Sequence, residues 1–475
     1  MYEIDLKNPV SIYFVGIGGV SMSGLAEILA DAGFRVSGSD RAPSDLCRHL
    51  EKLGIHVFYG QKAENIRDDL DCAVLTAAIR PDNPEFVALR EKGIPMLTRG
   101  QLLGQLMKNY RVPVAVSGTH GKTTTTSMIS EILLEAGKDP TLSIGGIYPR
   151  IQSNTRVGGK NYFVLEACEY TNSFLNFFPK ISLILNIEED HLDFFKDLAD
   201  IRRSFRKFAE LLPEDGALII NSEIEDLDEL TAGLSCPVIT YLGLGPKAAG
   251  KPAEGVAKSA PAPDYRAGDV SFDDAGHASF TVHAKGKADR RVTLGVPGAH
   301  NVGNALAAIA AADLLGIDDD AILSALAGFH GTDRRFEQKG TFRGVTVIDD
   351  YAHHPTEIQA TLTTALGVKK GTLWCVFQPH TYSRTKAFLS DFAKALSLAD
   401  KVVLADVYAA RETDNLGISS ETLQREIQKL GKECYYFPSF AEIENFLSEN
   451  CTKDDMLITM GAGDVYKIGE SLLKK

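Results

Sequence analysis

The sequence has little positive charge and no long apolar run. Its 50 lysines and arginines are outnumbered by 63 aspartates and glutamates, which gives a formal net charge of −13 at pH 7. Such a chain lacks the field that attracts a nucleic-acid backbone or an anionic membrane, so neither partner is expected. No stretch approaches the roughly 18 apolar residues of a membrane-spanning helix, and MYEIDLKNPV at the start lacks the apolar core of a signal peptide. We therefore expect a cytoplasmic protein.

The cysteines of the chain also form no metal-binding pattern. The seven cysteines are dispersed and odd in number, and no two of them form a Cys-x-x-Cys pair. This excludes the common zinc spacings and predicts reduced thiols. A soluble protein that acts on small molecules is the class that remains.

Short apolar segments alternate with amphipathic ones, and this pattern begins three times along the 475 residues. It predicts an α/β protein with three domains and mostly parallel, doubly wound sheets. We expect a Rossmann-like domain over 1–108, a central P-loop-type ATPase domain over 109–330 and a second Rossmann-like domain over 331–475. The predicted strands are 12–15, 34–37 and 73–76 in the first domain, 112–117, 162–165 and 181–187 in the second, and 345–348, 373–377, 402–405 and 456–459 in the third.

The later part of the central domain has a different composition. Residues 245–264 are rich in Ala, Pro, Gly and Lys without periodicity, which predicts a surface loop. Antiparallel strands are expected over 270–283 and 291–294, followed by a helix over 301–315.

The first glycine cluster occupies residues 16–24, directly after a predicted strand and before a helix. Glycines there let backbone N–H groups approach a pyrophosphate, and Asp40 follows the second strand where a Rossmann acidic residue meets a ribose hydroxyl. Ser21, however, stands at the third glycine position of the dinucleotide fingerprint. A dinucleotide site, another nucleotide-diphosphate site and tight packing alone all stay open.

The second glycine cluster, SGTHGKTTTT at 117–126, is more specific. It lies between an apolar strand and an amphipathic helix, where a Gly-Lys-Thr turn cradles a triphosphate. Lys122 is expected on the β- and γ-phosphates and the Thr123 hydroxyl on Mg²⁺. Val116 stands where the longer loop has its first glycine, so this loop is a shortened variant. A glycine-rich turn with a chance Lys-Thr pair is the alternative.

A metal ion at that loop needs a carboxylate from a neighbouring strand. Glu166 follows the strand 162–165 and is the natural ligand, because Mg²⁺ prefers oxygen donors. The strand 181–187 leads into Glu-Glu-Asp-His, and spacing alone indicates that His191 is a surface or capping histidine.

Seven segments, in order along the chain, resemble those of a known family. They are GTHGKTTTT at 118–126, EACEY at 166–170, NIEEDH at 186–191, HNVGN at 300–304, DDYAHHPTE at 349–357, FQPHTYSRT at 377–385 and GAGD at 461–464. Together they resemble the Mur ligase family over essentially the whole chain. The resemblance implies a first domain that holds a UDP-sugar, a second that holds ATP, and a third that closes over both and binds the amino acid. It implies that ATP and Mg²⁺ are used to join L-alanine to the lactyl carboxylate of UDP-N-acetylmuramate through an acyl phosphate, in peptidoglycan precursor synthesis.

The resemblance also implies roles for single residues. ATP would contact Gly118, Thr119, His120, Gly121, Lys122, Thr123, Thr124, Asn301, Asn304, Arg335 and Asp350. Mg²⁺ would be held by Thr123, Glu166 and His191, which reverses the interpretation of His191 from spacing. The UDP-sugar would contact Gly16, Gly18, Gly19 and Asp40, whereas the amino acid or acyl intermediate would face His353, His354, His380 and Arg384, with ordinary polar packing as the alternative for these four. The catalytic set would be Lys122, Glu166, His191, Asp350, His380 and Arg384.

Two positions depart from the family pattern. Many relatives have aspartate where Cys168 stands and arginine where Thr381 stands, and both changes bear on specificity for the amino acid. Some related ligases carry a carbamylated lysine. The corresponding region here reads RRSFRK at 202–207, and no carbamylated lysine is assigned in it.

Three other functions stay open at this point. They are a ligase that adds a preformed tripeptide to the same sugar, an NAD-dependent oxidoreductase that uses the cluster 16–24, and a nucleotide switch without substrate chemistry. The chain is expected to be a monomer or a weak homodimer.

Overall fold

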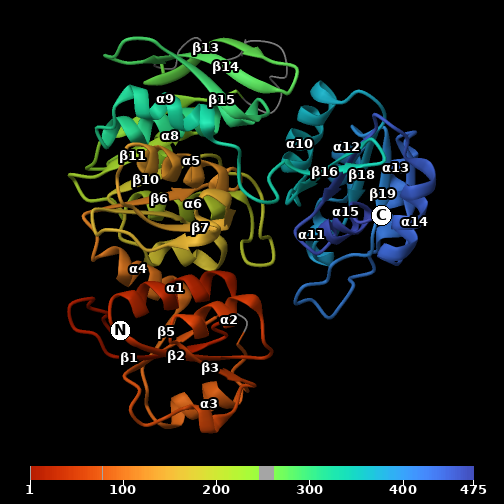
Figure 1. The fold of residues 1–475 in the computed structure, drawn as a ribbon. Helices are drawn as coiled ribbons and strands as arrows, with labels where there is room; N and C mark the ends of the chain where they lie inside the picture. Colours follow the sequence, from red (N-terminus) through yellow and green to blue (C-terminus); the bar gives the residue numbers. More distant parts are fainter. Residues whose placement is uncertain (1, 77–78, 245–261) are drawn as a thin grey trace.

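The computed structural model describes residues 2–76, 79–244 and 262–475. Three sheets follow one another along the chain, each with helices packed beside it (Figure 1). The predicted three-domain α/β class with mostly parallel sheets is confirmed. Most of the loop predicted over 245–264 lies outside the described residues. Within the described parts, each helix is too short or too polar to span a membrane.

The first domain is a parallel sheet in the order β3-β2-β1-β4-β5. Its central strand β1 is buried along its whole length, as a strand covered on both faces must be. The glycine cluster 16–24 follows β1, where the strand order reverses toward β4, and ligands bind at such switch points. The elements are β1 (Ser11–Val15), α1 (Val20–Asp31), β2 (Arg35–Asp40), α2 (Asp45–Lys52), β3 (His56–Tyr59), η1 (Ala63–Asn65), β4 (Cys72–Leu75), α3 (Pro84–Glu91), β5 (Met96–Thr98) and α4 (Arg99–Met107).

The central domain is a mixed sheet in the order β15-β14-β13-β12-β11-β10-β6-β9-β7-β8. Strands β10, β6 and β9 are parallel neighbours, so the segments that follow them meet at one edge of the sheet. The predicted antiparallel strands are confirmed as β13 to β15. The elements are β6 (Val112–Ser117), α5 (Lys122–Glu135), β7 (Thr141–Tyr148), η2 (Pro149–Ile151), β8 (Ser153–Arg156), β9 (Tyr162–Glu166), η3 (Tyr170–Asn176), β10 (Ile181–Ile184), α6 (Leu198–Ala209), β11 (Ala217–Asn221), α7 (Leu227–Thr231), β12 (Val238–Leu242), β13 (Tyr265–Phe272), β14 (His277–Ala284), β15 (Arg290–Pro297), α8 (His300–Leu314) and α9 (Asp319–Gly328).

The third domain has a sheet in the order β16-β17-β21-β18-β19-β20, in which only β16 is antiparallel to its neighbour among the described strands. Four of these strands carry the segments predicted from the sequence. The elements are β16 (Glu337–Phe342), β17 (Val345–Asp350), α10 (Pro355–Val368), β18 (Leu373–Phe377), α11 (Tyr382–Ala387), α12 (Leu389–Leu396), β19 (Lys401–Leu404), α13 (Ser420–Lys429), β20 (Glu433–Tyr436), α14 (Phe440–Asn450), β21 (Met456–Met460) and α15 (Tyr466–Leu472).

Predicted and observed elements differ mainly at their ends. Strand β10 stops at Ile184, three residues before the predicted end. Beyond it, the side-chain amide of Asn186 accepts from the backbone N–H of His120 at 2.7 Å and donates to the carbonyl oxygen of His120 at 3.1 Å. Backbone hydrogen bonds continue to Leu185 and Asn186, and the Asn186 side chain adds a clamp on the glycine-rich loop. The domain boundaries at 108/109 and 330/331 stay predictions.

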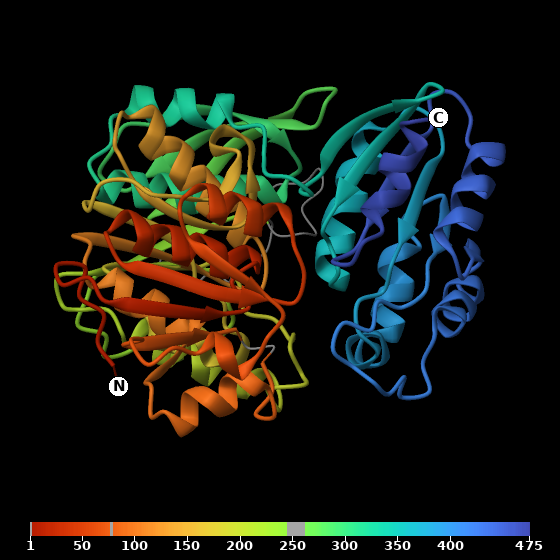
Figure 2. The ribbon, with the colours of Figure 1, turned by 60° about the horizontal axis from the view of Figure 1, so that its bottom comes forward.

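The apolar cores indicate which domains form one body. A single cluster of buried side chains joins Phe14 and Leu103 of the first domain to Phe163 and Phe205 of the central domain. The third domain has clusters of its own, one of them around Phe377. Figure 2 shows the third domain standing beside the other two. It can therefore move against them without opening an apolar core.

Candidate active site

The glycine-rich loop 118–121 joins β6 to α5 in a conformation that requires glycine. Gly118 has a φ of +143°, and Gly121, the residue before α5, has a φ of +82°. A Cβ on Gly118 would also lie 3.2 Å from the backbone nitrogen of Asn186. The loop leaves the first N–H groups of α5 at the carboxyl edge of the sheet, where they and the helix dipole favour an anion.

Lys122, the first residue of α5, is held by Glu169, a residue without a predicted role. Its Nζ lies 3.1 Å from Glu169 Oε2 and donates to the carbonyl oxygens of Gly118 and Thr119. The Glu169 side chain is only 3% exposed. Burial opposes the charge on Lys122, but Glu169 outweighs burial and raises the pKa of the lysine. The two residues are 47 positions apart, so no local spacing pairs them.

Glu166 and Thr123, two of the predicted Mg²⁺ ligands, lie beside the loop. Glu166 ends β9 opposite Val116 of β6. Its Oε1 accepts from the backbone N–H of Gly145 at 2.5 Å, which fixes the direction of the carboxylate. The Thr123 hydroxyl accepts from Arg335 of the third domain at 3.2 Å. Both oxygens are of the kind that Mg²⁺ prefers.

His191, the third predicted ligand, is partly buried, whereas spacing alone indicated a surface or capping histidine. Its side chain is 21% exposed, and its ring stacks on Tyr170 with centroids 4.5 Å apart. Nε2 lies 3.9 Å from Glu169 Oε1, beyond hydrogen-bond distance. Burial lowers the pKa of His191, which favours the neutral form that a metal ligand needs. The donor types of this proposed set, two oxygens and one imidazole nitrogen, are ones that a divalent cation accepts.

We expect Gly145→Ala to raise the Mg²⁺ concentration needed for half-maximal activity by about tenfold. Substitution of residues that orient a metal ligand commonly weakens metal binding by this much. A Cβ on Gly145 would lie 2.4 Å from Glu166 Oε2 and push the carboxylate aside. The measurement is the initial rate against Mg²⁺ concentration. Gly328→Ala is the matched control, because a Cβ on Gly328 meets nothing within 4 Å. An unchanged Mg²⁺ dependence in the Gly145 variant would show that the placement of the Glu166 carboxylate does not control Mg²⁺ binding.

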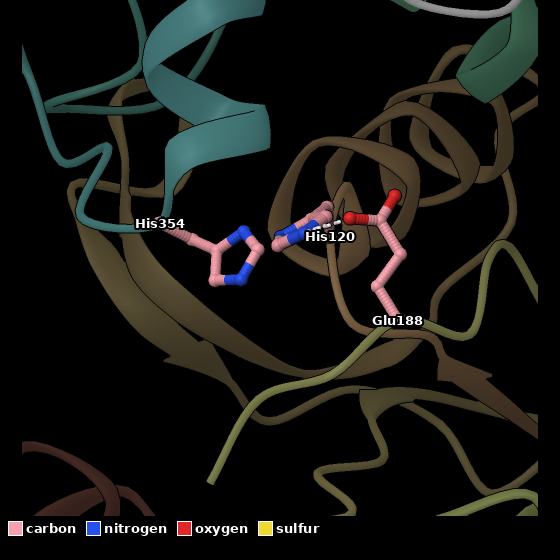
Figure 3. A group of neighbouring side chains, drawn as sticks. All are labelled: His120, Glu188 and His354. Atoms are coloured by element: carbon pink, nitrogen blue, oxygen red, sulfur yellow. Dashed lines mark ion pairs between the residues drawn. The ribbon is translucent and has the colours of Figure 1, made fainter. Parts of the chain in front are cut away.

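His120, also in the loop, lies between carboxylates of two domains. Its Nε2 is 3.3 Å from Glu188 Oε2 of the central domain, and its Nδ1 is 3.3 Å from Glu357 Oε1 of the third. Figure 3 shows the ring between Glu188 and His354, whose ring centroid is 4.7 Å away. Burial opposes protonation, but the two carboxylates outweigh it and raise the pKa of His120 to about 10. The same pairing lowers the pKa of Glu188 to about 2, against the effect of burial.

His120, Glu188 and His354 bring ligand atoms within 4.8 Å of one another, as a metal site would. His354, however, already uses both ring nitrogens. Nε2 faces the carbonyl oxygen of Glu189 at 3.0 Å and must donate to it, so Nδ1 is the acceptor for the N–H of Thr356 at 3.4 Å. Because His120 is paired with Glu188 and both ring nitrogens of His354 have other partners, the three residues fit a cation poorly.

A cavity of about 840 Å³ lies between the central and third domains, and Asn301 and Asn304 line it from the start of α8. Asn304 Nδ2 donates to Asn301 Oδ1 at 2.9 Å, and Asn301 Nδ2 donates to the carbonyl oxygen of Pro297 at 2.7 Å. A Cβ on Gly121 would lie 2.6 Å from Asn304 Oδ1. Of these two predicted ATP contacts, Asn304 thus lies against the glycine-rich loop, and Asn301 is hydrogen-bonded to Asn304.

Arg335 and Asp350 line the same cavity from the third domain. The Asp350 carboxylate accepts from the backbone N–H groups of Phe336 and Ala352 at 2.9 and 2.7 Å. Burial raises the pKa of Asp350 to about 6, because it outweighs the nearby Arg335 charge. Asp350 therefore holds the segment that carries Arg335 against the end of β17.

Arg384, His380 and His353 form a second group near the domain interface. Arg384 pairs with Asp190 of the central domain at 3.0 Å, and its guanidinium lies 3.2 Å from His380 Nδ1. The rings of His353 and His380 meet edge to face at 5.9 Å. Burial lowers the pKa of His353 to about 3 and that of His380 to about 4, so both are neutral near pH 7. Asp190 is a second residue that the sequence reasoning missed, and its place directly before His191 was the available signal.

The two departures from the family pattern lie near these groups. Thr381 has a φ of +66°, and its hydroxyl accepts from the backbone N–H of Arg384 at 3.4 Å at the start of α11. The Cys168 thiol is partly buried, and burial raises its pKa to about 11. Neither side chain carries a charge at neutral pH.

In the first domain, the glycine cluster 16–24 is hydrogen-bonded to Asp40, the acidic residue at the end of β2. Asp40 Oδ2 accepts from the backbone N–H of Gly18 at 2.9 Å, and Oδ1 accepts from that of Arg41 at 2.7 Å. Gly16 has a φ of +85°, and a Cβ on Gly18 would lie 2.8 Å from Asp40 Oδ2. The predicted contacts Gly16, Gly18, Gly19 and Asp40 are thus together, on a different sheet from the loop 118–121.

Three family models match the chain in sequence order. They are described as the Mur ligase family catalytic domain, the Mur ligase middle domain and the Mur ligase glutamate ligase domain, and they match residues 11–111, 116–312 and 334–463. The matched ranges cover most of the chain and fall one on each sheet.

Curated relatives are similar over the full length. Proteins named UDP-N-acetylmuramate–L-alanine ligase from Lachnospira eligens and Agathobacter rectalis are 56% and 57% identical, with 100% of each chain covered. Among solved structures, the UDP-N-acetylmuramate–alanine ligase of Thermotoga maritima matches with a TM-score of 0.79 at 31% identity. A murein peptide ligase from Psychrobacter arcticus matches with a TM-score of 0.71 at 25% identity, and 98% of both chains is covered in each structural comparison.

Proposed function

This chain belongs to the Mur ligase family, and from that membership we propose that it joins L-alanine to the lactyl carboxylate of UDP-N-acetylmuramate while ATP is converted to ADP and phosphate. It is an ATP-dependent, amide-forming ligase. Within the family, this reaction is supported by the sequence identity of 56% and 57%, over the full length, to relatives named UDP-N-acetylmuramate–L-alanine ligase. Those relatives support neither the oxidoreductase nor the nucleotide-switch alternative.

The loop 118–121 and Lys122 supply what the first half of the reaction requires. A carboxylate that attacks the γ-phosphate of ATP approaches a polyanion, so the repulsion between them must be cancelled. The N-terminal end of α5 and the Lys122 ammonium provide fixed positive charge at one place. Mg²⁺ held by Thr123, Glu166 and His191 would add a Lewis acid there. The product of this half-reaction would be an acyl phosphate on the sugar's lactyl group.

The third domain supplies what the second half requires. An acyl phosphate must be kept from water until the amine of L-alanine displaces phosphate. Arg335 reaches the central domain at Thr123, and Arg384 reaches it at Asp190. Arg384 would bind the carboxylate of the amino acid, with His353 and His380 as neutral neighbours of the attacking amine. The enzyme would work in the cytoplasm, where nucleotide-linked precursors and ATP are present together.

We expect phosphate release only when ATP, UDP-N-acetylmuramate and L-alanine are all present. The measurement is a phosphate-release assay with a panel of amino acids and the stem tripeptide as competing acceptors. NAD and NADP, offered in a separate absorbance assay, should give no turnover. Faster release with the tripeptide than with L-alanine would overturn the proposed acceptor and favour the recycling ligase. Release that is independent of the UDP-sugar would favour a nucleotide switch.

A further inference from the structure

The interface between the central and third domains is rich in polar contacts. The apolar core clusters do not cross it within the described residues, and Figure 2 shows the third domain beside the other two. Ion pairs and hydrogen bonds cross it instead, and they join His120 to Glu357, Thr356 to Glu188, His354 to Glu189, Arg335 to Thr123 and Arg384 to Asp190. Because no shared core fixes the third domain, these polar contacts decide where it sits.

His120 is the member of this set that belongs to the loop 118–121 itself. Its backbone is clamped by Asn186, and its side chain is 12% exposed. Neither ring nitrogen has a hydrogen-bond partner of good geometry among the described residues, although a carboxylate oxygen faces each at 3.3 Å. The attraction between His120 and Glu357 is therefore one of charge, and it acts directly between the loop and the first turn of α10.

Glu357 also contacts His353, a second residue of the third domain. While Oε1 faces His120, Oε2 accepts from the backbone N–H of His353 at 3.0 Å. His353 Nδ1 faces the carbonyl oxygen of Tyr351 at 3.1 Å and must donate to it, so the orientation of this imidazole depends on the same turn of backbone. The His353 ring in turn contacts the ring of His380. The loop that would hold ATP is thus linked to the group that would face the amino acid.

We propose that His120 is a positioning residue, whose ion pair with Glu357 seats the third domain on the loop 118–121 and thereby orients His353. This inference rests on the proposed ligase function for its activity readout. His120 acts through Glu357, so it lowers the barrier only by holding Arg335, Asp350 and His353 where the reaction needs them. The UDP-sugar site on the first sheet is outside this linkage.

A double-mutant cycle of His120→Asn and Glu357→Gln tests the linkage. Glutamine keeps an oxygen that can accept from the His353 N–H and removes only the charge. Each single variant is expected to lower kcat about 10–100-fold, as loss of a close charge pair between two surfaces does, with the Kd for UDP-N-acetylmuramate changed less than about threefold. The kcat of the double variant should lie within about twofold of the kcat of the slower single variant.

The control is Glu421→Gln, since Glu421 is an exposed carboxylate in the first turn of α13 and is the counterpart of Glu357 in α10. It should leave kcat unchanged. Losses that multiply in the double variant, or a kcat unchanged in either single variant, would overturn the proposal. If His120→Asn does not fold, Glu357→Gln alone must still show the loss of kcat with an unchanged Kd for the UDP-sugar.

Small-angle scattering tests the same inference without turnover. With UDP-N-acetylmuramate and a non-hydrolysable ATP analogue, the wild-type radius of gyration should fall, and both variants should stay expanded. Variants that become as compact as the wild type would contradict the positioning role. A wild-type protein that compacts but releases no alanine-dependent phosphate would instead count against the proposed function.

Discussion

Replacing Lys122 by alanine is expected to lower the rate of amide formation by about 10²–10³ and to leave the affinity for UDP-N-acetylmuramate within about threefold. The variant removes a fixed positive charge from the place where the phosphoryl group is transferred, and one such contact is worth about 3–4 kcal/mol. The proposed UDP-sugar contacts lie at the glycine cluster 16–24, which is on a different sheet from Lys122. Phosphate release and calorimetric titration with the UDP-sugar measure the two quantities separately.

The same variant is expected to be less stable, because it leaves Glu169 buried without its partner. Breaking one half of a buried ion pair costs about 3–5 kcal/mol. Adding Glu169→Gln should restore the unfolding temperature but not the rate, which separates stability from catalysis. Lys138→Ala, at an exposed residue just after the end of α5, is the control and should behave as the wild type. A folded Lys122 variant with full ligase rate, or one that no longer binds the UDP-sugar, would contradict the two-site assignment.

Glu166→Ala is expected to lose activity by about 10² or more at every Mg²⁺ concentration. Glu166 is the carboxylate at the end of β9, and its removal takes away the one negatively charged donor of the proposed set. A Lewis acid that stabilises the transferring phosphoryl group contributes several kcal/mol, so its misplacement accounts for a loss of this size. The measurement is the initial rate over a wide range of Mg²⁺ concentrations.

The position of Glu166 predicts a contrast with the Gly145 variant. Gly145→Ala displaces the carboxylate, so high Mg²⁺ should restore its rate, whereas Glu166→Ala should stay slow. Glu214→Ala, at an exposed carboxylate before β11, is the control for loss of one negative charge. Unaltered kinetics in the Glu166 variant would remove this residue from the metal site.

Local sequence predicted the elements that hold the site, because strand and helix patterns and glycine-rich turns are local properties. The strands 112–117 and 373–377 have the predicted bounds. The loop after the first of these places Lys122 and Thr123 at the start of α5, as the Gly-Lys-Thr pattern predicts. Family resemblance added residues of the third domain that no local pattern connects to the loop.

Tertiary structure alone decided which charges are paired. Glu169 is the partner of Lys122, and Asp190 is the partner of Arg384, but neither pairing has a signature in spacing. Spacing also indicated that His191 is a surface or capping residue, whereas its side chain is only 21% exposed and its ring stacks on Tyr170. Each of these depends on how strands distant in sequence are ordered in a sheet.

The sequence by itself therefore determined the class of fold, the phosphate-binding loop and the family, since these depend on short segments with fixed local geometry. Only the tertiary structure placed His120 between Glu188 and Glu357, with the two carboxylates in different domains. The physical reason is that a buried charge is stable only where its partners converge on it, and the folding of separate domains brings those partners together.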